Sequence, residues 1–567
     1  MERYGYSGAG CRRLMLVWAA FMLTLAAAAQ SRSFRLGGLP GAVDTCLHRV
    51  LFTLPEGADS GAAGLCLEML PAPLSAEVDG QPLGADGALP LAGGRGERVL
   101  TLAAEDGRTE RWTLDFTTLP LVIVDTSGLP ISKGSDTPAR IELIDAAGRL
   151  PGGTEWATRG NIHGRGASSY QLFPKKSYTL KLLDDEGKKS EASLLGNREE
   201  DTWVLDAMAC DLARMRNRVC FDVWNAVGVK APHALRAGTQ GEFVELTVNG
   251  RYMGLYCMGD KVNRTLLGAK KTRSADEVRG VIYKGIAWGG PSIVLMHDAE
   301  APTDVATWHN WEMAHPDALP SAETWAPLFE LIDFTDCGDF GRMAREWSEW
   351  FDARNATYLP VFFSAFNLRD NFLKNAYLAL HDYAADVRGW WIQPWDLDYG
   401  FNRDYRGALS TVQADLESIV HNTMPFAILL EYNLGDYRSR CAEAWREMRR
   451  GPLNEAAVEK RLRGYETLFE ASGAWRRERE RWSGDPLVLP ELSEEVDYMV
   501  EWYKSNCARL DDYYAALVSA AGSVRLAPQR APEAVCTLDG RRIAATPQGI
   551  EKLPRGVYVV GGRKVLR

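Results

Sequence analysis

The sequence lacks the short motifs that mark several common classes of site. It contains no Cys-x-x-Cys pair and no His-Glu-x-x-His motif, so neither a structural zinc site nor a zincin is indicated. Its glycine-rich stretch at 160–169 is not followed by Gly-Lys-Ser or Gly-Lys-Thr, which excludes a Walker phosphate loop. Basic residues are not in excess either, because the formal net charge is −10. We therefore expect no nucleic-acid partner, since such binders usually carry a basic domain.

Long apolar runs are also missing beyond the N-terminus, where no stretch of about 18 or more apolar residues occurs. Residues 1–29 have the features of a secretory signal peptide: Arg12 and Arg13 precede an apolar run at 14–25, and small residues at 27–29 fit a cleavage site. An uncleaved N-terminal anchor is the alternative. We expect an exported protein in the periplasm, at the cell surface or outside the cell, with no transmembrane segment in the mature chain.

Cysteine is present but poorly placed for a disulfide framework. Of the ten cysteines, nine remain once Cys11 leaves with the signal peptide, and their spacings are wide. Export permits disulfides, and Cys46 and Cys66 could bridge two strands of the first unit. Cys210 and Cys220 are predicted in one helix over residues 208–227, about 15 Å apart at 1.5 Å per residue, which is too far for a bond. Most thiols are expected in the core.

The rest of the composition indicates a folded chain of several units. Hydrophobic residues make up 46% of 567 residues, enough for about three units of ~150 residues each. Residues 30–118 alternate between short apolar runs and turns, resemble a small immunoglobulin-like β-sandwich and are expected to be a spacer or presentation module. Residues 119–520 begin with strands and continue with helices, which predicts an α+β fold with a cleft between two lobes. Residues 521–567 predict a small β-module.

Two aspartates with an asparagine between them carry the strongest chemical signal. Asp370 is followed five residues later by Asn375 and, after short apolar runs at 376–380 and 389–393, by Asp396. Protein kinases use this order: the first aspartate orients the acceptor hydroxyl, and the other two residues hold metal ions at the phosphates. The two runs predict a hairpin that brings Asn375 and Asp396 to one Mg²⁺ or Mn²⁺. The alternative is that these side chains bound turns and pair locally.

The glycine-rich stretch and the lysines that follow it are candidates to bind phosphate. Exposed backbone N–H groups and Arg165 can face phosphate oxygens. An ammonium group from Lys176 or Lys181 can neutralise α and β phosphates. These two lysines lie five residues apart, so strand alternation points them to opposite faces, and only one is expected to reach the cleft. A simple loop with solvated lysines is the alternative.

Several ordered motifs over residues 119 to about 410 resemble the spore-coat-protein-H (CotH) kinase family. The motifs are Arg165-Gly166-x-Ser168-Ser169, Lys175-Lys176-Ser177-Tyr178, Met215-Arg216-Asn217, Val248-Asn249-Gly250-x-Tyr252-x-Gly254-Leu255-Tyr256, Tyr283-Lys284, the segment from Asp370 to Asn375, and Pro394-Trp395-Asp396-Leu397-Asp398. The resemblance implies an atypical protein kinase that uses ATP and Mg²⁺ or Mn²⁺ to phosphorylate serine on secreted or surface proteins. Two positions depart from the family pattern, Asp260 in place of glutamate and Ala167 in place of asparagine.

The resemblance also assigns roles by position. Asp370 would match the catalytic aspartate and Asp396 the metal-binding one. The supporting metal ligands would be Asn375 and Asp398, and the nucleotide contacts would be Arg165, Lys176, Lys181 and Lys284. The C-terminal segment 521–567 resembles the sorting modules that Bacteroidetes proteins carry for type IX secretion, which implies export machinery as a partner. A plain β-appendage is the alternative.

The leading prediction is an exported CotH-like protein kinase that transfers the ATP γ-phosphoryl group to Ser or Thr of a secreted or surface protein. ATP is expected to be scarce outside the inner membrane, which favours a dilute ligand, modification before export, or loss of activity.

The main alternative is a catalytically silent kinase-fold surface protein for adhesion or polysaccharide binding. Tryptophans at 308, 311, 325, 347 and 350 are expected to pack between helices rather than form a sugar-binding face. A glycosidase is weaker, because Asp396 and Asp398 share one strand without a substrate cleft.

Overall fold

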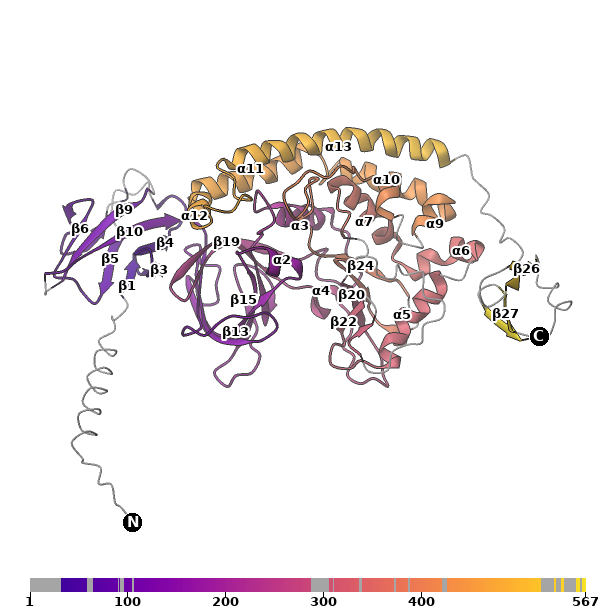
Figure 1. Ribbon diagram of the computed structural model, residues 1–567, viewed down its shortest axis with the longest axis horizontal. Helices are drawn as coiled ribbons and strands as arrows, with labels where there is room; N and C mark the ends of the chain where they lie inside the picture. The colour runs from indigo at the N-terminus through magenta and orange to yellow at the C-terminus, as the bar shows by residue number, and fades with distance from the viewer. Residues whose placement is uncertain are drawn as a thin grey trace, which may run out of the picture.

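The computed structural model describes most of the chain. The described residues are 32–58, 65–89, 91, 96–104, 107–286, 305–308, 311–335, 339–371, 374–385, 388–420, 426–521, 535–536, 542–544, 557–560 and 563–566. The predicted signal peptide at 1–29 lies outside them. In Figure 1 a β-sandwich, a β-barrel and a mixed helix–sheet region follow one another, and the long helix α13 (Leu492–Ala521) runs along the second and third. The fold is α+β, as predicted.

The N-terminal sandwich consists of two sheets with one shared core. Their strand orders are β2-β1-β5-β8 and β3-β4-β10-β9-β6-β7. The strands are β1 (Ser33–Leu36), β2 (Leu39–Pro40), β3 (Ala42–Asp44), β4 (Arg49–Thr53), β5 (Leu65–Leu70), β6 (Ser75–Val78), β7 (Gln81–Pro82), β8 (Ala88–Leu89), β9 (Arg98–Ala103) and β10 (Thr109–Thr117). Leu36 and Leu67 from one sheet pack against Leu102 and Phe116 from the other. Cys46 and Cys66 are free and exposed, so the disulfide considered between them is not formed.

Seven strands then close into a barrel in the order β11-β12-β13-β14-β17-β19-β18. They are β11 (Leu121–Asp125), β12 (Thr137–Ile144), β13 (Glu155–Arg165), β14 (Ser177–Leu183), β17 (Thr202–Asp206), β18 (Gly241–Val248) and β19 (Arg251–Asp260). Alternate side chains such as Ile141, Leu180 and Leu246 fill the interior. The β18–β19 hairpin turns at Asn249 and Gly250, both with positive φ, which confirms the hairpin predicted from that dipeptide. The shorter elements are α2 (Ser168–Leu172), β15 (Ala192–Ser193), β16 (Glu199–Glu200) and α4 (Arg264–Leu267).

Helix α3 (Arg216–Val227) is shorter than the helix predicted over residues 208–227. The preceding segment turns instead, because Met208 and Arg214 adopt positive φ. The carboxylate of Asp211 accepts hydrogen bonds from the backbone N–H groups of Ala213 (2.8 Å) and Arg216 (2.7 Å), which stabilises this turn. Cys210 therefore lies outside the helix, where its thiol can face the rest of the molecule.

The third region combines a five-stranded sheet with the remaining helices. The sheet has the order β21-β22-β20-β23-β24, with β20 (Val281–Gly285), β21 (Thr307–Trp308), β22 (Trp311–His315), β23 (Ala376–Leu380) and β24 (Trp391–Pro394). The helices are α5 (Ala322–Thr335), α6 (Phe340–Trp350), α7 (Ala353–Phe366), α8 (Leu416–Val420), α9 (Phe426–Glu431), α10 (Tyr437–Arg449), α11 (Glu455–Ala471), α12 (Ala474–Arg481) and α13. The five tryptophans predicted to pack between helices are all buried, but Trp308 and Trp311 lie in strands β21 and β22 rather than in helices.

Helix α12 connects the sandwich to the barrel through a buried guanidinium. Arg477 donates to Asp115 of β10 at 2.8 Å and to the two carboxylate oxygens of Glu245 of β18 at 2.7 and 2.8 Å. All three side chains are almost fully buried. A buried charge is tolerated when it is paired and hydrogen-bonded in this way. The sandwich is therefore fixed to the barrel by specific ion pairs.

The next residue of α12, Glu478, joins the barrel to the segment before α3. One carboxylate oxygen of Glu478 accepts from Lys175 Nζ at 2.7 Å and Arg214 Nε at 3.0 Å, and the other accepts from the backbone N–H of Leu255 at 2.9 Å. Gly254 has φ +103°, and a Cβ there would lie 2.2 Å from the Glu478 carboxylate. The glycine of the Tyr-x-Gly-Leu-Tyr motif is thus required by a side chain from a distant helix.

Near the C-terminus, four short strands form one sheet in the order β26-β25-β27-β28. They are β25 (Val535–Cys536), β26 (Arg542–Ala544), β27 (Val557–Val560) and β28 (Arg563–Leu566). The rest of the predicted sorting module lies outside the described residues, and its role and all the domain boundaries stay predictions. No helix in the part of the chain covered by the structure is long and apolar enough to cross a membrane.

Candidate active site

The hairpin predicted from sequence is present. Strands β23 and β24 pair antiparallel with Ala376 opposite Pro394, and the backbone N–H of Trp395 donates to the carbonyl of Asn375 at 2.9 Å. Asn375 and Asp396, which flank this pairing, adopt φ of +57° and +62°. Asn and Asp adopt the left-handed region more readily than other side chains. The two residues predicted to share a cation therefore lie side by side at one end of the hairpin.

Asp370 lies beside this hairpin end and is buried. One carboxylate oxygen accepts from Asn375 Nδ2 and from Lys374 Nζ, each at 3.1 Å. The other oxygen, Oδ1, is buried and has no hydrogen-bond partner among the residues that the structure describes. Burial raises the pKa of Asp370 to about 6, and the negative charge of Asp396 acts in the same direction while Lys374 opposes it. An unpaired buried acceptor is costly, so this oxygen is poised to accept a proton or a ligand group.

Asn371 holds the loop that carries Asp396. Its Nδ2 donates to the carbonyls of Trp395 at 2.6 Å and Asp396 at 2.8 Å, which also fixes the orientation of the amide. Its Oδ1 is another buried oxygen without a partner within the described residues. Asn371 was not predicted as a site residue, although it lies in the motif from Asp370 to Asn375.

Asp396 and Asp398 are half-buried and close to other carboxylates. Burial is the main reason that the pKa of each carboxyl group is raised. The negative charge of Asp206 adds to the rise at Asp396, and the charge of Asp396 adds to the rise at Asp398. The thiol of Cys210 donates to Asp398 Oδ2 at 3.0 Å. Such crowding of negative charge is relieved by protonation or by a bound cation.

Asp206 and Asn217 connect the barrel to this loop, and neither was predicted as a site residue. Asn217 Nδ2 donates to Asp206 Oδ2 at 3.0 Å, and Asn217 Oδ1 accepts from the backbone N–H of Leu397 at 2.9 Å. Asp206 ends β17, so one amide joins a barrel strand to the segment between the two aspartates. The available signal was the Met215-Arg216-Asn217 motif, whose amide we did not connect to the carboxylates.

Positive side chains face the same carboxylates. Arg165, at the end of β13, lies over the ring of Trp395 at 5.4 Å. The charges of Arg165, Lys374 and Lys284 all oppose the rise in the pKa of Asp396. Burial lowers the pKa of Lys284, which lies 5.7 Å from the ring of Tyr377. Arg165 and Lys284 thus lie near enough to Asp396 to act on its charge, and their nucleotide role stays a prediction.

Lys261 is a further cation of this cluster that sequence reasoning missed. It follows directly on β19 and is exposed, and partial desolvation lowers its pKa, helped by the nearby charges of Arg165 and Lys284. Nothing in its sequence context distinguished it from any other surface lysine. Three cations, from the end of β13, from β20 and from the residue after β19, therefore lie near one another.

Lys176 and Lys181 have other partners. Lys176 Nζ donates to the carbonyls of Tyr170 and Phe173, around the end of α2. Lys181 pairs with Asp136 at 2.8 Å, and its side chain is 41% exposed on the barrel surface. The structure does not bring either ammonium group to the carboxylates, and their nucleotide role stays a prediction.

The glycine-rich stretch is mainly strand, which corrects the expectation of a phosphate-binding loop. Strand β13 extends to Arg165, and a Cβ at Gly164 would lie 2.2 Å from the ring of Tyr170. Only Gly166, with φ +111°, and Ala167 separate the strand from α2. The glycines therefore permit close packing, and few backbone N–H groups remain for a ligand.

Asp260, which stands where the CotH family pattern has a glutamate, has a structural role. Its carboxylate is buried and accepts from Arg198 Nε at 2.6 Å, from Arg236, and from the backbone N–H of Gln240 at 2.8 Å. These contacts fix the end of β19 just before Lys261. The shorter acid thus orders the strand that positions one of the cations.

Comparison with known families agrees with this arrangement. The family model described as CotH kinase protein matches residues 162–510, more than half of the chain. The chain belongs to the CotH kinase protein family. The match begins within β13 and ends in α13, so it includes every residue of the site and helix α12. No curated protein matches the chain.

A CotH kinase family member is expected to use ATP and a divalent metal ion, and the residues here fit such an ion. Within the described part of the chain, no three His, Cys, Asp or Glu side chains gather closely enough to hold an ion by themselves. Mg²⁺ usually takes only one or two protein carboxylates and completes its shell with phosphates and water. Asp396 and Asn375 offer oxygen ligands only, since the Asn375 amide nitrogen faces Asp370. A hard cation that arrives with a nucleotide suits this donor set.

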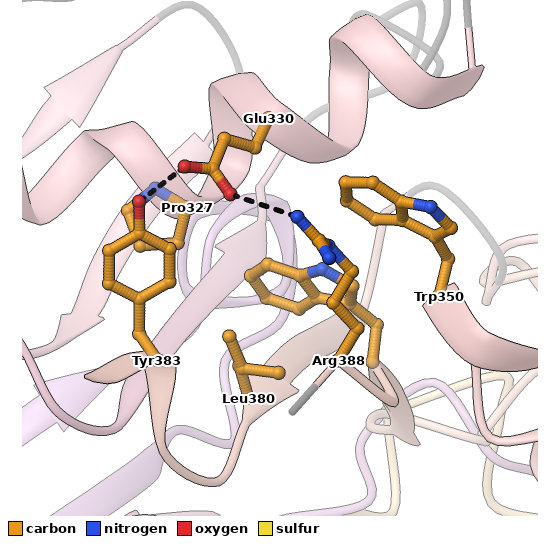
Figure 2. Close-up of a pocket in the computed structure, with 7 residues that line it drawn as sticks. Pro327, Glu330, Trp350, Leu380, Tyr383 and Arg388 are labelled. Carbon is orange, nitrogen blue, oxygen red and sulfur yellow. Dashed lines mark hydrogen bonds and ion pairs between the residues drawn. The ribbon is translucent and has the colours of Figure 1, made fainter. Parts of the chain in front are cut away.

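A small hollow elsewhere in the CotH domain is not a nucleotide site. Figure 2 shows Glu330 between the hydroxyl of Tyr383, which donates to it, and the guanidinium of Arg388 at 3.9 Å. Trp350 lies against Arg388 at 4.2 Å. The cavity measures about 20 Å³, which is room for about one water molecule.

Proposed function

We propose that this protein is an exported protein kinase that transfers the γ-phosphoryl group of ATP to Ser or Thr of a secreted or surface protein. The observation that carries the proposal is the unpaired Oδ1 of Asp370, buried beside Asn375 in a site that also contains Asp396 and the cations Arg165 and Lys284. Family membership supports kinase chemistry. The barrel and the helix–sheet region would be the two lobes around the nucleotide.

Asp370 would act on the acceptor hydroxyl. Lys374 and Asn375 occupy one of its oxygens, so the other is directed to a proton donor. The acceptor oxygen forms a bond to the γ-phosphorus, the bond from phosphorus to the β–γ bridging oxygen breaks, and the hydroxyl proton passes to Asp370. A pKa of about 6 leaves this carboxylate mainly ionised at neutral pH and still basic enough to accept that proton.

The cations would stabilise the charge on the phosphoryl group. Arg165 and Lys284 are held in place before nucleotide binds, because each packs against an aromatic ring. Fixed charges of this kind favour the transition state without reorganisation. A divalent cation bound by Asp396, with Asn375 and Asp398 assisting, would neutralise phosphate charge.

Export and its consequences rest on the sequence. The signal peptide and the sorting-like tail would take the protein to the periplasm, the cell surface or the medium with the help of export machinery. ATP is expected to be scarce there, so phosphorylation would use a dilute ligand or precede export.

A catalytically silent surface protein is the second candidate. The feature that favours it is the departure from the family pattern at Ala167, close to Arg165. The buried tryptophans weaken its polysaccharide-binding form, because Trp325 and Trp347 are 0% and 2% exposed and present no ring to a sugar.

The proposal is tested with the purified mature protein, labelled ATP, Mn²⁺ or Mg²⁺, and a serine-rich acceptor. We expect Asp396→Ala to abolish metal-dependent nucleotide binding. Asp370→Asn is expected to retain binding and to lose transfer by about 10²- to 10⁴-fold. Asp185→Ala, at an exposed position on the barrel, is the matched control and keeps both. Equal nucleotide affinity in wild type and Asp396→Ala refutes the metal role.

A further inference from the structure

A large open cavity lies beside the candidate active site and has no role in the proposed chemistry. Its volume is about 530 Å³. It is formed by the end of α2, by the segment that follows Asp398, and by the segment after α12. Its apolar wall consists of Leu172, Phe173, Pro174, Trp482, Pro486 and Leu487. This size and lining suit one large apolar side chain or a short stretch of polypeptide.

One side chain links the cavity to the site. Arg214 Nη2 lies 4.0 Å from Oδ2 of Asp485, a cavity residue. Arg214 Nη1 donates to the carbonyl of Ala209 at 2.9 Å, and the thiol of the next residue, Cys210, donates to Asp398 Oδ2 at 3.0 Å. The cavity therefore lies close to the segment that contacts Asp398.

The polar groups of the cavity favour a particular ligand. Arg406 stacks on Tyr405 at 5.0 Å and Arg481 on Trp482 at 4.2 Å, so two guanidinium groups are held at the wall. Such arginines pair well with carboxylates. Asp485 adds no further ligand group, because its Oδ2 is buried and lies 4.0 Å from Arg214 Nη2.

We infer that this cavity docks the acceptor polypeptide, as a segment with an aromatic or large apolar side chain flanked by carboxylates. The apolar side chain fills the cavity, and the carboxylates pair with Arg406 and Arg481. This inference rests on the proposed kinase function and specifies its substrate. A nucleotide base fits less well, because the phosphate-facing cations Arg165 and Lys284 lie with Trp395 and Tyr377, which do not line the cavity.

The test measures peptide binding to the full mature protein without ATP. The probes are two fluorescein-labelled peptides with a central serine, one with phenylalanine and glutamates around it and one with the glutamates replaced by lysines. We expect wild type to prefer the acidic peptide. Arg406→Glu is expected to weaken that binding about tenfold, because an ion pair becomes a like-charge contact, and to reverse the preference. Leu172→Asp, at a side chain 57% exposed, is expected to weaken both peptides.

Matched controls lie away from the cavity. Lys188→Glu reverses a charge whose side chain is 74% exposed, and Leu235→Asp changes a leucine that is 54% exposed. Both are expected to bind the acidic peptide like wild type. If the controls and the cavity variants bind it equally, the docking inference is wrong.

A second measurement separates this inference from the proposed function. Binding of a fluorescent ATP analogue with Mn²⁺ is expected to be unchanged in Arg406→Glu and Leu172→Asp. If both variants lose the nucleotide and keep the peptide, the cavity holds the base and the inference is overturned. If the acidic peptide binds through the cavity but is never phosphorylated, the docking inference stands and the kinase proposal fails.

Discussion

The neighbours of Asp370 determine its charge state and which of its two carboxylate oxygens is free to accept a hydrogen bond. Lys374 and Asn375 occupy one oxygen and leave the other unpaired. Asn371, the next residue, instead donates to the backbone carbonyls of Trp395 and Asp396. Adjacent residues of one motif thus serve separate purposes, one chemical and one positional.

Asn371→Ala tests that positional role. The change leaves the carbonyls of Trp395 and Asp396 without their donor, at a cost of about 1 to 3 kcal/mol for a buried acceptor. We expect the loop to loosen, Mn²⁺-dependent nucleotide affinity to fall, and the melting temperature to drop. Titration with a fluorescent nucleotide and thermal unfolding check this. Unchanged affinity alongside a lower melting temperature would limit Asn371 to stability.

At the scale of elements, buried charges decide how strands and helices meet. Asp382 follows β23 and accepts from Arg279 at 2.7 Å and from Lys270 at 2.7 Å, which ties the segment between α4 and β20 to the hairpin of the site. Gly254 of β19 lies against the Glu478 carboxylate of α12. Both contacts fix elements on which the site is built.

The Asp382 contact predicts a pH dependence. The Arg279 and Lys270 side chains hold the pKa of Asp382 well below its usual range. Its contribution to stability is therefore fully present above the unfolded-state pKa of about 3.9 and is lost as pH falls below that value. We expect Asp382→Asn to be less stable than wild type at pH 6 and to converge with it in acid. Urea unfolding from pH 6 to pH 2.5 measures this, and a constant difference would contradict it.

Gly254→Ala tests the contact between β19 and α12. Alanine at φ +103° is strained by about 1 to 3 kcal/mol, and its Cβ would also displace the Glu478 carboxylate. We expect clear destabilisation in chemical unfolding. Gly464→Ala is the matched control, because Gly464 lies within α11 with no atom within 4 Å of an added Cβ. It is expected to stabilise by up to about 1 kcal/mol.

At the scale of the whole molecule, α12 unites parts that are far apart in sequence. Arg477 and Glu478 bind the sandwich, the barrel and the segment before α3. Figure 1 shows α12 between the sandwich and the barrel. The sandwich is thus attached by paired charges as well as by the chain.

Arg477→Met is expected to destabilise the protein by about 3 to 5 kcal/mol, because it leaves the buried carboxylate of Glu245 without a cation. It also removes one of the two arginines that pair with Asp115, where Arg476 remains. Arg463→Met is the control, since Arg463 pairs with Asp497 at the surface, where side chains are 38% and 62% exposed. Its effect should stay below about 1 kcal/mol. Calorimetry or urea unfolding compares the two, and equal losses would show that the buried pairs contribute little.

Removal of the tail is the last prediction. Helix α13 ends at Ala521, and the four-stranded sheet lies beyond it. A chain that ends at Gly522 is expected to fold and to bind nucleotide as the full chain does, but to stay in the periplasm, because a sorting module is read independently of its cargo. Cell fractionation and nucleotide binding measure the two effects. A truncated chain that unfolds, or that still reaches the surface, contradicts the sorting role.

Local patterns were sufficient for the elements that carry the site. The α+β class, the β18–β19 hairpin at Asn249-Gly250 and the β23–β24 hairpin all followed from apolar runs and turn residues close together in sequence. The order of Asp370, Asn375 and Asp396 was informative for the same reason, since one hairpin relates them. Such features depend on backbone preferences within a short segment, and the residue types of that segment are enough to predict them.

Only the tertiary structure decided which side chains meet across the chain. Cys210 reaches Asp398 over 188 residues, Asn217 reaches Leu397 over 180, and Glu478 reaches Lys175 over 303. Lys176 and Lys181 look like phosphate ligands in sequence, yet nearby carbonyls and Asp136 bind them. The sequence by itself determined the hairpins and the family motifs, because these are local. The packing of the barrel and α12 determined the partners, because a charged side chain takes the partner that the completed fold places within reach.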